Sequence, residues 1–367
     1  MERLQRADTG NEFRYLNISD MNTCYQYYER YATNLVNRIN DPIKNPYNRK
    51  GIKTFVFDYL WKSSLNAGGA EFEAKDGLVI NEGTLLNIYG LFYKLNTKIN
   101  TTIELSHVVE NITQLNSTII YHNECKPEEP IISQIIFSDN VILNNISEYM
   151  AMCAIKFLIA HEIGHIFNGH TKYYKDVRNQ IKRIEENGGK DLTKLNQLYL
   201  DLQTMEMDAD AFAICRLIDE VIDLFITKDK ILELLKTPSD VIKLLIYAIH
   251  GIFYLCKDTD QVNYMKKEHP PSLIRESLIY EAMIGYFSKK YNLDVSAVLA
   301  NNLGTIDRHF YYVDNASNSQ FMKYLDEFAE EADTYAEKIM NNYWEKVSLI
   351  LEADARLPIE KKDLKDY

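Results

Sequence analysis

Two histidines and a glutamate near the middle of the chain have the types and spacing of a hydrolytic metal site. If His161 and His165 lie on a helix, they differ by only about 40° around its axis, so both imidazoles can bind one metal ion. Glu162 then lies beside the same cleft, where its carboxylate can accept a proton from a water molecule on the metal. The segment from His161 to His165 therefore predicts a catalytic Zn²⁺ site.

This chemistry requires a helix, and the surrounding sequence predicts one over residues 147–167. The segment contains no proline, and its apolar residues recur at mostly helical spacing. Ser147 can cap the start of the helix, and Gly169 can end it. Apolar residues flank the motif on both sides, so the helix should be central. Burying two histidines and a glutamate there is costly unless they pair with other groups or bind a metal.

A catalytic zinc ion usually has a third protein ligand. The pattern His-Glu-x-x-His-x-x-Gly-x-x-His would place a glycine at position 168 and a histidine at position 171. The chain has Asn168 and Thr171 there, so this arrangement fails. His170 is about 180° around the helix from His161, or lies beyond its end, and is predicted to be a surface residue.

Glu206 is the better candidate for the third ligand. It lies in a second predicted helix, residues 192–224, and shares one stripe of that helix with Asp210 and Ala213. Its carboxylate could complete a site of two histidines and one glutamate. Asp210, one turn further on, could accept a hydrogen bond from a ligating histidine. Asp208 is about 200° from Glu206 and is predicted to be solvated. The alternative is that these acids form a hydrated helix face.

These segments resemble the gluzincin zinc metallopeptidases, because the His161–His165 motif is followed by Glu206 and Asp210 in a Glu-x-x-x-Asp pattern. A His-Pro-Pro segment that begins at His269 resembles the HtpX-like and CAAX-prenyl-protease-like branch of that group. The phage-exclusion peptidases of bacteria, which are soluble, also carry the His-Glu-x-x-His helix. The resemblance ends at Arg275. The first branch is often embedded in membranes, and this chain departs from it in that respect.

The resemblance implies hydrolysis of peptide bonds in a protein substrate. Zn²⁺ held by His161, His165 and Glu206 would lower the pKa of a bound water to roughly 7 and polarise the scissile carbonyl. Glu162 would act as the general base and later pass the proton to the leaving amine. The resemblance also implies a small sheet before the zinc helix, with an edge strand that pairs with the substrate backbone. Residues 131–137 are the best candidate for that strand, with a plain core strand as the favoured alternative.

The segment around Pro270 and Pro271 has two interpretations. Arg275 or His269 could donate a hydrogen bond to the developing oxyanion, because the rigid proline pair would fix their approach. Alternatively, the prolines only make a stiff turn before a helix that starts near Ser272.

The composition is that of an ordinary globular protein, with 46% hydrophobic and 26% charged residues. The net charge of −12 argues against nucleic acid and anionic membranes as partners. The opening residues lack the apolar core of a signal peptide. The longest apolar run, residues 241–256, is shorter than a membrane span and is predicted to be a core helix. The five cysteines form no Cys-x-x-Cys pair, so neither a zinc finger nor a disulfide framework is expected. We therefore expect a soluble, cytoplasmic protein.

The remaining sequence predicts a predominantly helical α+β fold with a zincin-like core, a small N-terminal sheet and two ligand-bearing helices. Residues 1–146 would be the mixed α/β part of the catalytic unit, 147–290 its zinc-binding core, and 291–367 a helical extension. Further predicted elements are helices at 20–38, 82–95 and 318–351, β-strands at 54–60, 77–80, 117–121 and 131–137, and a solvated helical hairpin at 171–194. The helix at 318–351 is expected to pack within the same chain, with a dimer seam as the alternative.

Three functions fit these observations. The first is a soluble zinc endopeptidase with a protein or peptide substrate. The second is a regulatory or toxin-type protease of bacterial defence that stays inactive until a protein partner or a phage signal releases it. The third is a non-catalytic protein with a structural metal site. Glu162 argues against the third, because a purely structural site needs no base.

Overall fold

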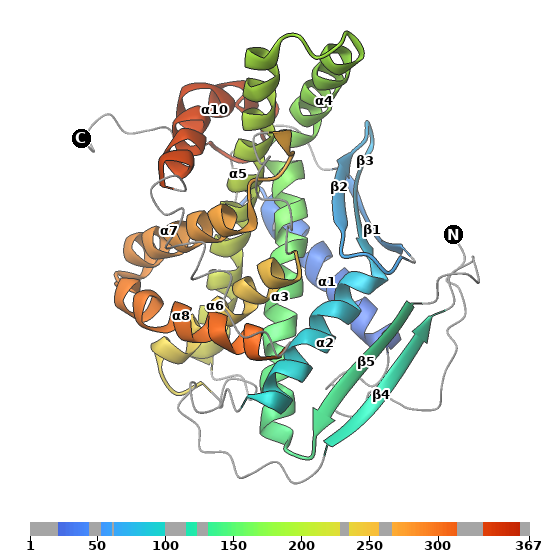
Figure 1. Cartoon of the computed structure of the whole chain (residues 1–367), viewed down its shortest axis with the longest axis vertical. Coiled ribbons are helices and arrows are strands. Elements are labelled where there is room, and N and C mark those ends of the chain that lie inside the picture. Colours follow the sequence, from blue (N-terminus) through green and yellow to red (C-terminus); the bar gives the residue numbers. More distant parts are fainter. Residues whose placement is uncertain are drawn as a thin grey trace.

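Two long helices, α3 (Val141–Phe167) and α5 (Leu192–Thr227), lie side by side through the centre of the computed structural model (Figure 1). The structure describes residues 21–43, 53–60, 62–99, 115–122, 131–227, 235–256, 266–313 and 333–359. The other helices are α1 (Met21–Asn40), α2 (Glu82–Lys98), α4 (His170–Glu186), α6 (Pro238–Leu255), α7 (Ser272–Tyr291), α8 (Ser296–Val313), a helix over 333–342, the π-helix η3 (Tyr343–Val347) and α10 (Ser348–Leu351). The predicted class, a predominantly helical α+β fold, is confirmed.

The strands form two small sheets. In the first, β1 (Thr54–Leu60) is parallel to β3 (Lys75–Asn81), and β2 (Ala67–Glu71) is antiparallel to β3 at the sheet's edge. The second consists of β4 (Leu115–His122) and β5 (Ile131–Ser138), which lie beside α2 (Figure 1). All four predicted strands are therefore present. The sequence analysis missed β2, because its Ala-Gly-Gly-Ala-Glu sequence lacks the β-branched and aromatic residues that favour strands.

The central helix α3 begins earlier than the sequence predicted. Asn140 caps it, since its side-chain oxygen accepts hydrogen bonds from the backbone N–H groups of Ile142 and Leu143 at 2.9 and 3.3 Å. Ser147 is not the cap but lies inside the helix, where its hydroxyl donates to the Leu143 carbonyl at 2.8 Å. Asparagine caps a helix as well as serine does. The helix therefore begins at Val141, and residues 141–146 also belong to it.

The end of α3 agrees with the prediction, because the helix stops at Phe167 and Gly169 has a φ of 82°. This left-handed conformation ends α3, and α4 starts at the next residue. The turn is also tightly packed: a Cβ atom on Gly169 would lie 2.6 Å from the backbone nitrogen of Ala355. Glycine is therefore required here by both conformation and space. The chain reverses only after α4, so α4 lies at the end of the molecule where the motif-bearing part of α3 ends (Figure 1).

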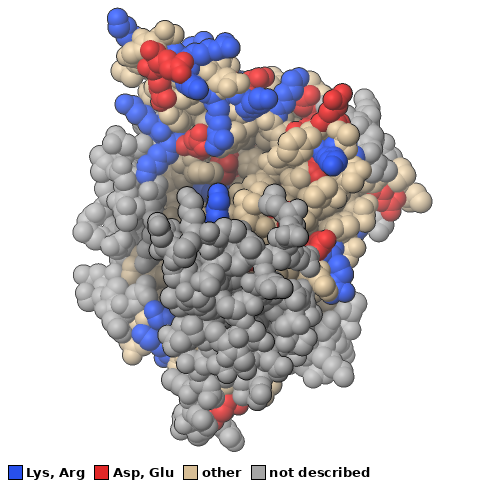
Figure 2. All heavy atoms as spheres, turned by 90° about the vertical axis from the view of Figure 1, so that its right-hand side faces the viewer, with Lys and Arg blue, Asp and Glu red and all other residues tan. Residues whose placement is uncertain are grey.

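The predicted helical hairpin after α3 is confirmed. α4 carries charged side chains of both signs along its exposed face and ends at Glu186. Gly188 and Gly189 then turn with φ values of 85° and 63° before α5 begins. In Figure 2 the Lys, Arg, Asp and Glu side chains gather at the end of the molecule that this hairpin forms. A mixed charge pattern of this kind is typical of a solvated helix.

The apolar run at 241–256 forms the core helix α6, as predicted. Thr237 and Asp240 cap its start reciprocally through side-chain bonds to each other's backbone. Among the described helices, α3 and α6 are each long and apolar enough to cross a membrane, but 83% and 78% of their most apolar windows are buried in the protein. Burial of this extent is typical of core helices.

The C-terminal segment packs within the same chain. Residues 314–332, which include Phe321, Leu325 and Phe328 of the predicted apolar stripe, lie outside the described residues. Tyr335 and Ile339 are buried in a second, smaller apolar cluster against α4 and α5. The division of the chain at residues 146 and 290 stays a prediction.

Candidate active site

A cavity of about 840 Å³ opens beside the middle of the molecule. Its walls come from β2, the C-terminal part of α3, the first turns of α4, Glu206 of α5, and the segment from His269 to Arg275. His161, Glu162 and His165 all line it. The motif from α3 is thus in a hollow large enough to hold several residues of an extended peptide.

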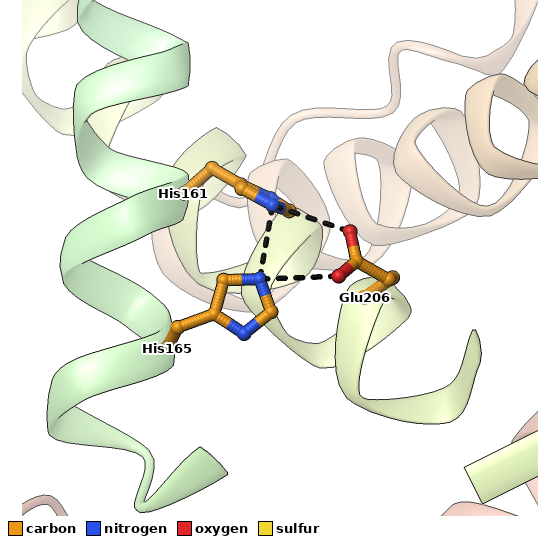
Figure 3. Close-up of side chains that lie close together, drawn as sticks. All are labelled: His161, His165 and Glu206. Atoms are coloured by element: carbon orange, nitrogen blue, oxygen red, sulfur yellow. Dashed lines mark hydrogen bonds and ion pairs between the residues drawn. The ribbon is translucent and has the colours of Figure 1, made fainter. Parts of the chain in front are cut away.

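Three potential ligand atoms converge in this cavity (Figure 3). The Nε2 atoms of His161 and His165 are 3.1 Å apart. His161 Nε2 lies 3.4 Å from Glu206 Oε2, and His165 Nε2 lies 3.4 Å from the other carboxylate oxygen, Oε1. Atoms bound to one zinc ion at about 2.0–2.1 Å in tetrahedral geometry lie roughly 3.3 Å from one another. Among the described residues, His161, His165 and Glu206 form the group whose residue types and atomic separations fit a metal site.

Helix packing explains this convergence. A Cβ atom on Gly164 would lie 3.3 Å from the Cα atom of Ala209, so α3 and α5 are in close contact within the motif itself. Ala209 and Ala213 are both fully buried at this contact. Small residues on both helices therefore let the histidines of α3 reach the carboxylate of α5.

The surroundings of Glu206 fit a cation. The residue is only 2% exposed, and its buried Oε2 atom accepts no hydrogen bond of good geometry in the described structure. Burial alone would raise the pKa of Glu206, but the charges of His269 and His165 hold it well below its usual value. A buried, ionised carboxylate costs free energy unless positive charge lies nearby, and His269 Nδ1 is 2.9 Å from the Glu206 Oε2 atom. The donor set of two imidazoles and one carboxylate is one that zinc accepts.

Asp210 lies behind His161, where the sequence analysis placed it. Its Oδ1 atom is 2.7 Å from His161 Nδ1, the nitrogen that faces away from Glu206. Burial alone would lower the pKa of His161, but Asp210 and Glu206 outweigh this effect and raise it to about 10. The acids of α5 therefore favour a positive charge at this point of the cavity.

Arg275 has a different environment from the one predicted for an oxyanion donor. Its Nε and Nη2 atoms donate to the two carboxylate oxygens of Asp210 at 2.8 and 2.7 Å, and Nη2 is 3.5 Å from Glu206 Oε2. Its side chain is 16% exposed. A guanidinium held by two charge-assisted bonds orients Asp210, and through it His161. The alternative interpretation of the proline pair as a turn also fits, because α7 begins at Ser272.

His269 is the more accessible of the two predicted donors. Its side chain is 57% exposed, and its Nδ1 atom lies 2.9 Å from Glu206 Oε2. The charge of Glu206 raises the pKa of His269. A protonated His269 at the rim of the cavity could donate to a substrate oxygen, so its assignment as oxyanion donor stays a prediction.

We expect Arg275→Ala to lower the free energy of unfolding by about 3–5 kcal/mol, because it leaves the buried Asp210 carboxylate without its charged partner. Urea unfolding of the metal-free protein measures this loss. Arg178→Ala is the matched control: that side chain is 54% exposed and pairs with Glu268, so its loss should cost less than about 1 kcal/mol. Equal stability of the Arg275 variant and the wild type would contradict the assignment of a buried pair. The same variant should lose turnover more than zinc content.

Glu162 is held by the edge strand β2. The backbone N–H of Gly69 donates to Glu162 Oε2 at 2.7 Å. The strand approaches so closely that a Cβ atom on Gly69 would lie 2.5 Å from the backbone oxygen of Glu162. Only glycine fits this contact. One carboxylate oxygen of Glu162 is thus fixed toward the strand, which orients the group at the wall of the cavity.

Two sequence-based predictions next to the motif are wrong. His170 is not a surface residue: it is fully buried, with Nδ1 3.0 Å from His165 Nδ1 and Nε2 2.9 Å from Asp208 Oδ2. Asp208 is not simply solvated, because it also accepts a hydrogen bond from Asn168 at 2.7 Å. Both errors come from the break at Gly169, because α3 ends there and the first residue of α4, His170, lies between His165 of α3 and Asp208 of α5.

The edge strand that lines the cavity is β2, and the prediction of residues 131–137 is wrong. That segment forms β5, which pairs with β4 in the other sheet and contributes no residue to the cavity. In contrast, all of β2 from Ala67 to Glu71 lines it. The motif Gly68-Gly69 was the available signal, because glycine within a strand often marks close approach of another backbone.

Other cavity residues had no distinctive sequence signal. Tyr174 and Arg178 of α4 also line the cavity. Arg178 Nε donates to Glu268 Oε1 at 2.8 Å, and the guanidinium lies over the Tyr174 ring at 4.5 Å. In the sequence these residues belong to a polar, charge-rich stretch that is typical of any exposed helix.

Comparisons with known proteins place the chain in a family. A model of the family described as peptidase U49 matches residues 96–283, slightly more than half of the chain. The matched segment includes α3, α5 and Arg275. Comparisons with curated proteins and with solved structures each give no match. The chain therefore belongs to the peptidase U49 family, and it is a hydrolase that acts on protein or peptide substrates.

Proposed function

We propose that this peptidase is a zinc-dependent endopeptidase of the gluzincin type. The observation that carries the proposal is the convergence of His161, His165 and Glu206, whose ligand atoms are separated by 3.1–3.4 Å in the cavity. His161 and His165 would bind the ion through Nε2, and Glu206 through its carboxylate. A zinc ion bound there would supply Lewis acidity to a water molecule and to the scissile carbonyl.

Glu162 is the general base in this proposal. The Gly69 N–H fixes one of its oxygens, which leaves the other for a water molecule in the cavity. The residue follows His161 directly on α3, so its carboxylate lies beside the ligands without being one of them. The hydrogen bond from β2 limits the rotation of the side chain, and a preorganised base needs less rearrangement during the reaction.

The edge strand β2 is proposed to hold the substrate backbone. Its inner edge pairs with β3, and it is the outermost strand of its sheet. An extended peptide could add to the outer edge through main-chain hydrogen bonds, which recognise backbone and not sequence. Because the cavity has a volume of about 840 Å³ and is also lined by Tyr174 and Arg178, side chains on both sides of a scissile bond would have room. This arrangement favours cleavage within a chain.

A partner-triggered peptidase is the second candidate, and one observation favours it. The Arg178–Glu268 ion pair joins α4 to the segment just before His269, and both partners are partly exposed, at 54% and 35%. Such a pair could restrict entry to the cavity until a protein partner displaces it. A non-catalytic role for the metal site is not supported, because the chain belongs to a peptidase family.

Metal removal tests the main proposal. We expect the purified protein to contain about one zinc ion per chain, to lose activity on a denatured protein after dialysis against a chelator, and to regain it with Zn²⁺. Elemental analysis and the release of peptides measure both effects. Activity that persists in metal-free protein would overturn the proposal. Activity that requires added cell extract as well as zinc would favour the triggered peptidase.

A further inference from the structure

We infer that His170 and Asp208 are positioning residues that fix the ring of His165 for metal binding. The inference rests on the proposed metal site and extends it to a second layer of side chains. His165 presents Nε2 to Glu206 at 3.4 Å, and its other nitrogen, Nδ1, lies 3.0 Å from His170 Nδ1. His170 in turn presents Nε2 to Asp208 at 2.9 Å. The three side chains form a continuous chain from the proposed ligand His165 to Asp208 of α5.

The partners within this chain determine where its protons lie. His170 is fully buried between the His165 ring and the Asp208 carboxylate, and each of its ring nitrogens faces one of them. A neutral imidazole has one N–H donor and one acceptor nitrogen. An ionised Asp208 can only accept, so His170 must donate from Nε2 and accept at Nδ1. His165 must then donate from Nδ1, which leaves the lone pair of its Nε2 directed at Glu206 and the metal position.

The chain also orients the ring of His165. The imidazoles of His165 and His170 meet nearly edge to face, with centroids 5.0 Å apart and an interplanar angle of 72°. Asp208 cannot turn away, because Asn168 also donates to its Oδ2 atom at 2.7 Å. Each proposed histidine ligand is therefore supported by an aspartate of α5: His161 directly by Asp210, and His165 through His170 by Asp208.

His170 is unsuited to be a ligand itself. Its Nδ1 faces the back of the His165 ring, and its Nε2 faces Asp208. Within the described part of the chain, the group of ligand atoms close enough to share an ion is His161, His165 and Glu206. The contribution of His170 is thus made through His165, by fixing its tautomer and its direction.

The zinc affinity of four proteins tests this inference. His170→Phe keeps a ring of similar size but removes the acceptor for His165, and we expect zinc binding about 10–100-fold weaker than in the wild type. His170→Gln retains both an acceptor and a donor and should restore most of the affinity. Tyr173→Phe is the matched control, because it removes a 2.8 Å hydrogen bond to Asp201 at the same α4–α5 contact without touching His165. Competition with a chromophoric chelator measures each affinity.

A second measurement needs no variant. In the zinc-loaded wild type, ¹⁵N–¹H correlation spectra of histidine side chains should show His165 protonated at Nδ1 and His170 protonated at Nε2. His170 protonated at Nδ1 would overturn the inference. So would a folded His170→Phe protein with wild-type zinc affinity. Failure of the wild type itself to bind zinc would instead overturn the proposed metal site, so the two failures are distinguishable.

Discussion

Glu162→Gln is expected to lower kcat/KM by about 10²–10⁴-fold while the zinc content stays at the wild-type level. The amide keeps the size of the side chain, and its carbonyl oxygen can still accept the Gly69 N–H that bonds the carboxylate at 2.7 Å. β2 should therefore remain in place. What the variant loses is the capacity to take a proton from water, because an amide is not a base at neutral pH.

Steady-state kinetics on a quenched peptide substrate and elemental analysis of the same sample separate chemistry from metal binding. A loss of kcat at unchanged KM would indicate that the carboxylate acts in the transition state and not in substrate binding. Wild-type activity of the Glu162→Gln variant would contradict the assignment of Glu162 as the general base. Loss of zinc along with activity would make Glu162 a ligand instead of a base.

Glu206→Gln is expected to weaken zinc binding by more than the roughly 10–100-fold that the loss of an outer hydrogen-bond partner costs. The change removes the negative charge from the ligand set and leaves His161 and His165 as the remaining ligands. The carboxylate is 2% exposed and ionised, so water cannot easily replace it. Peptidase activity should fall with the metal content.

Thermal unfolding with and without Zn²⁺ measures this effect. A bound ligand at 100 times its Kd stabilises a protein by about 2.7 kcal/mol, so a weaker site shows a smaller zinc-dependent rise in Tm. Glu162→Gln is the matched control, because it makes the same chemical change in the same cavity and should retain the full zinc-dependent rise. Equal zinc stabilisation of both variants would contradict the assignment of Glu206 as a ligand.

Much of the candidate site could be predicted from sequence because its geometry is local. The 3.6-residue period of a helix places His161 beside His165, whatever the rest of the fold does. The same period places Glu206 and Asp210 on one stripe of α5. The apolar flanks predicted that both helices are buried. Buried polar side chains cost free energy unless they pair with other groups or bind an ion, so their helical spacing predicts a common site. The ligand-bearing segments could therefore be predicted without knowledge of the segments that pack against them.

The predictions that depended on contacts between distant segments were less successful. Ile131 to Phe137 has the alternation of a strand, and it does form one, but nothing local decides which strand meets α3. β2 does so because Gly69 permits a backbone approach that a residue with a side chain could not make. Steric fit between elements, and not strand propensity, determined which edge lines the cavity.

The sequence by itself determined the two ligand-bearing helices, the histidine pair and glutamate of α3, and the acidic stripe of α5. Each of these features follows from the periodicity of one helix. Only the tertiary structure decided the surroundings of those residues. Arg275 pairs with Asp210 across 65 positions of the chain. His170 is buried because a new helix starts after the left-handed turn at Gly169, and its first side chain lies between His165 and Asp208. Such partners depend on where separate segments meet, and that is set by close packing of the whole core and not by the spacing of residues along one segment.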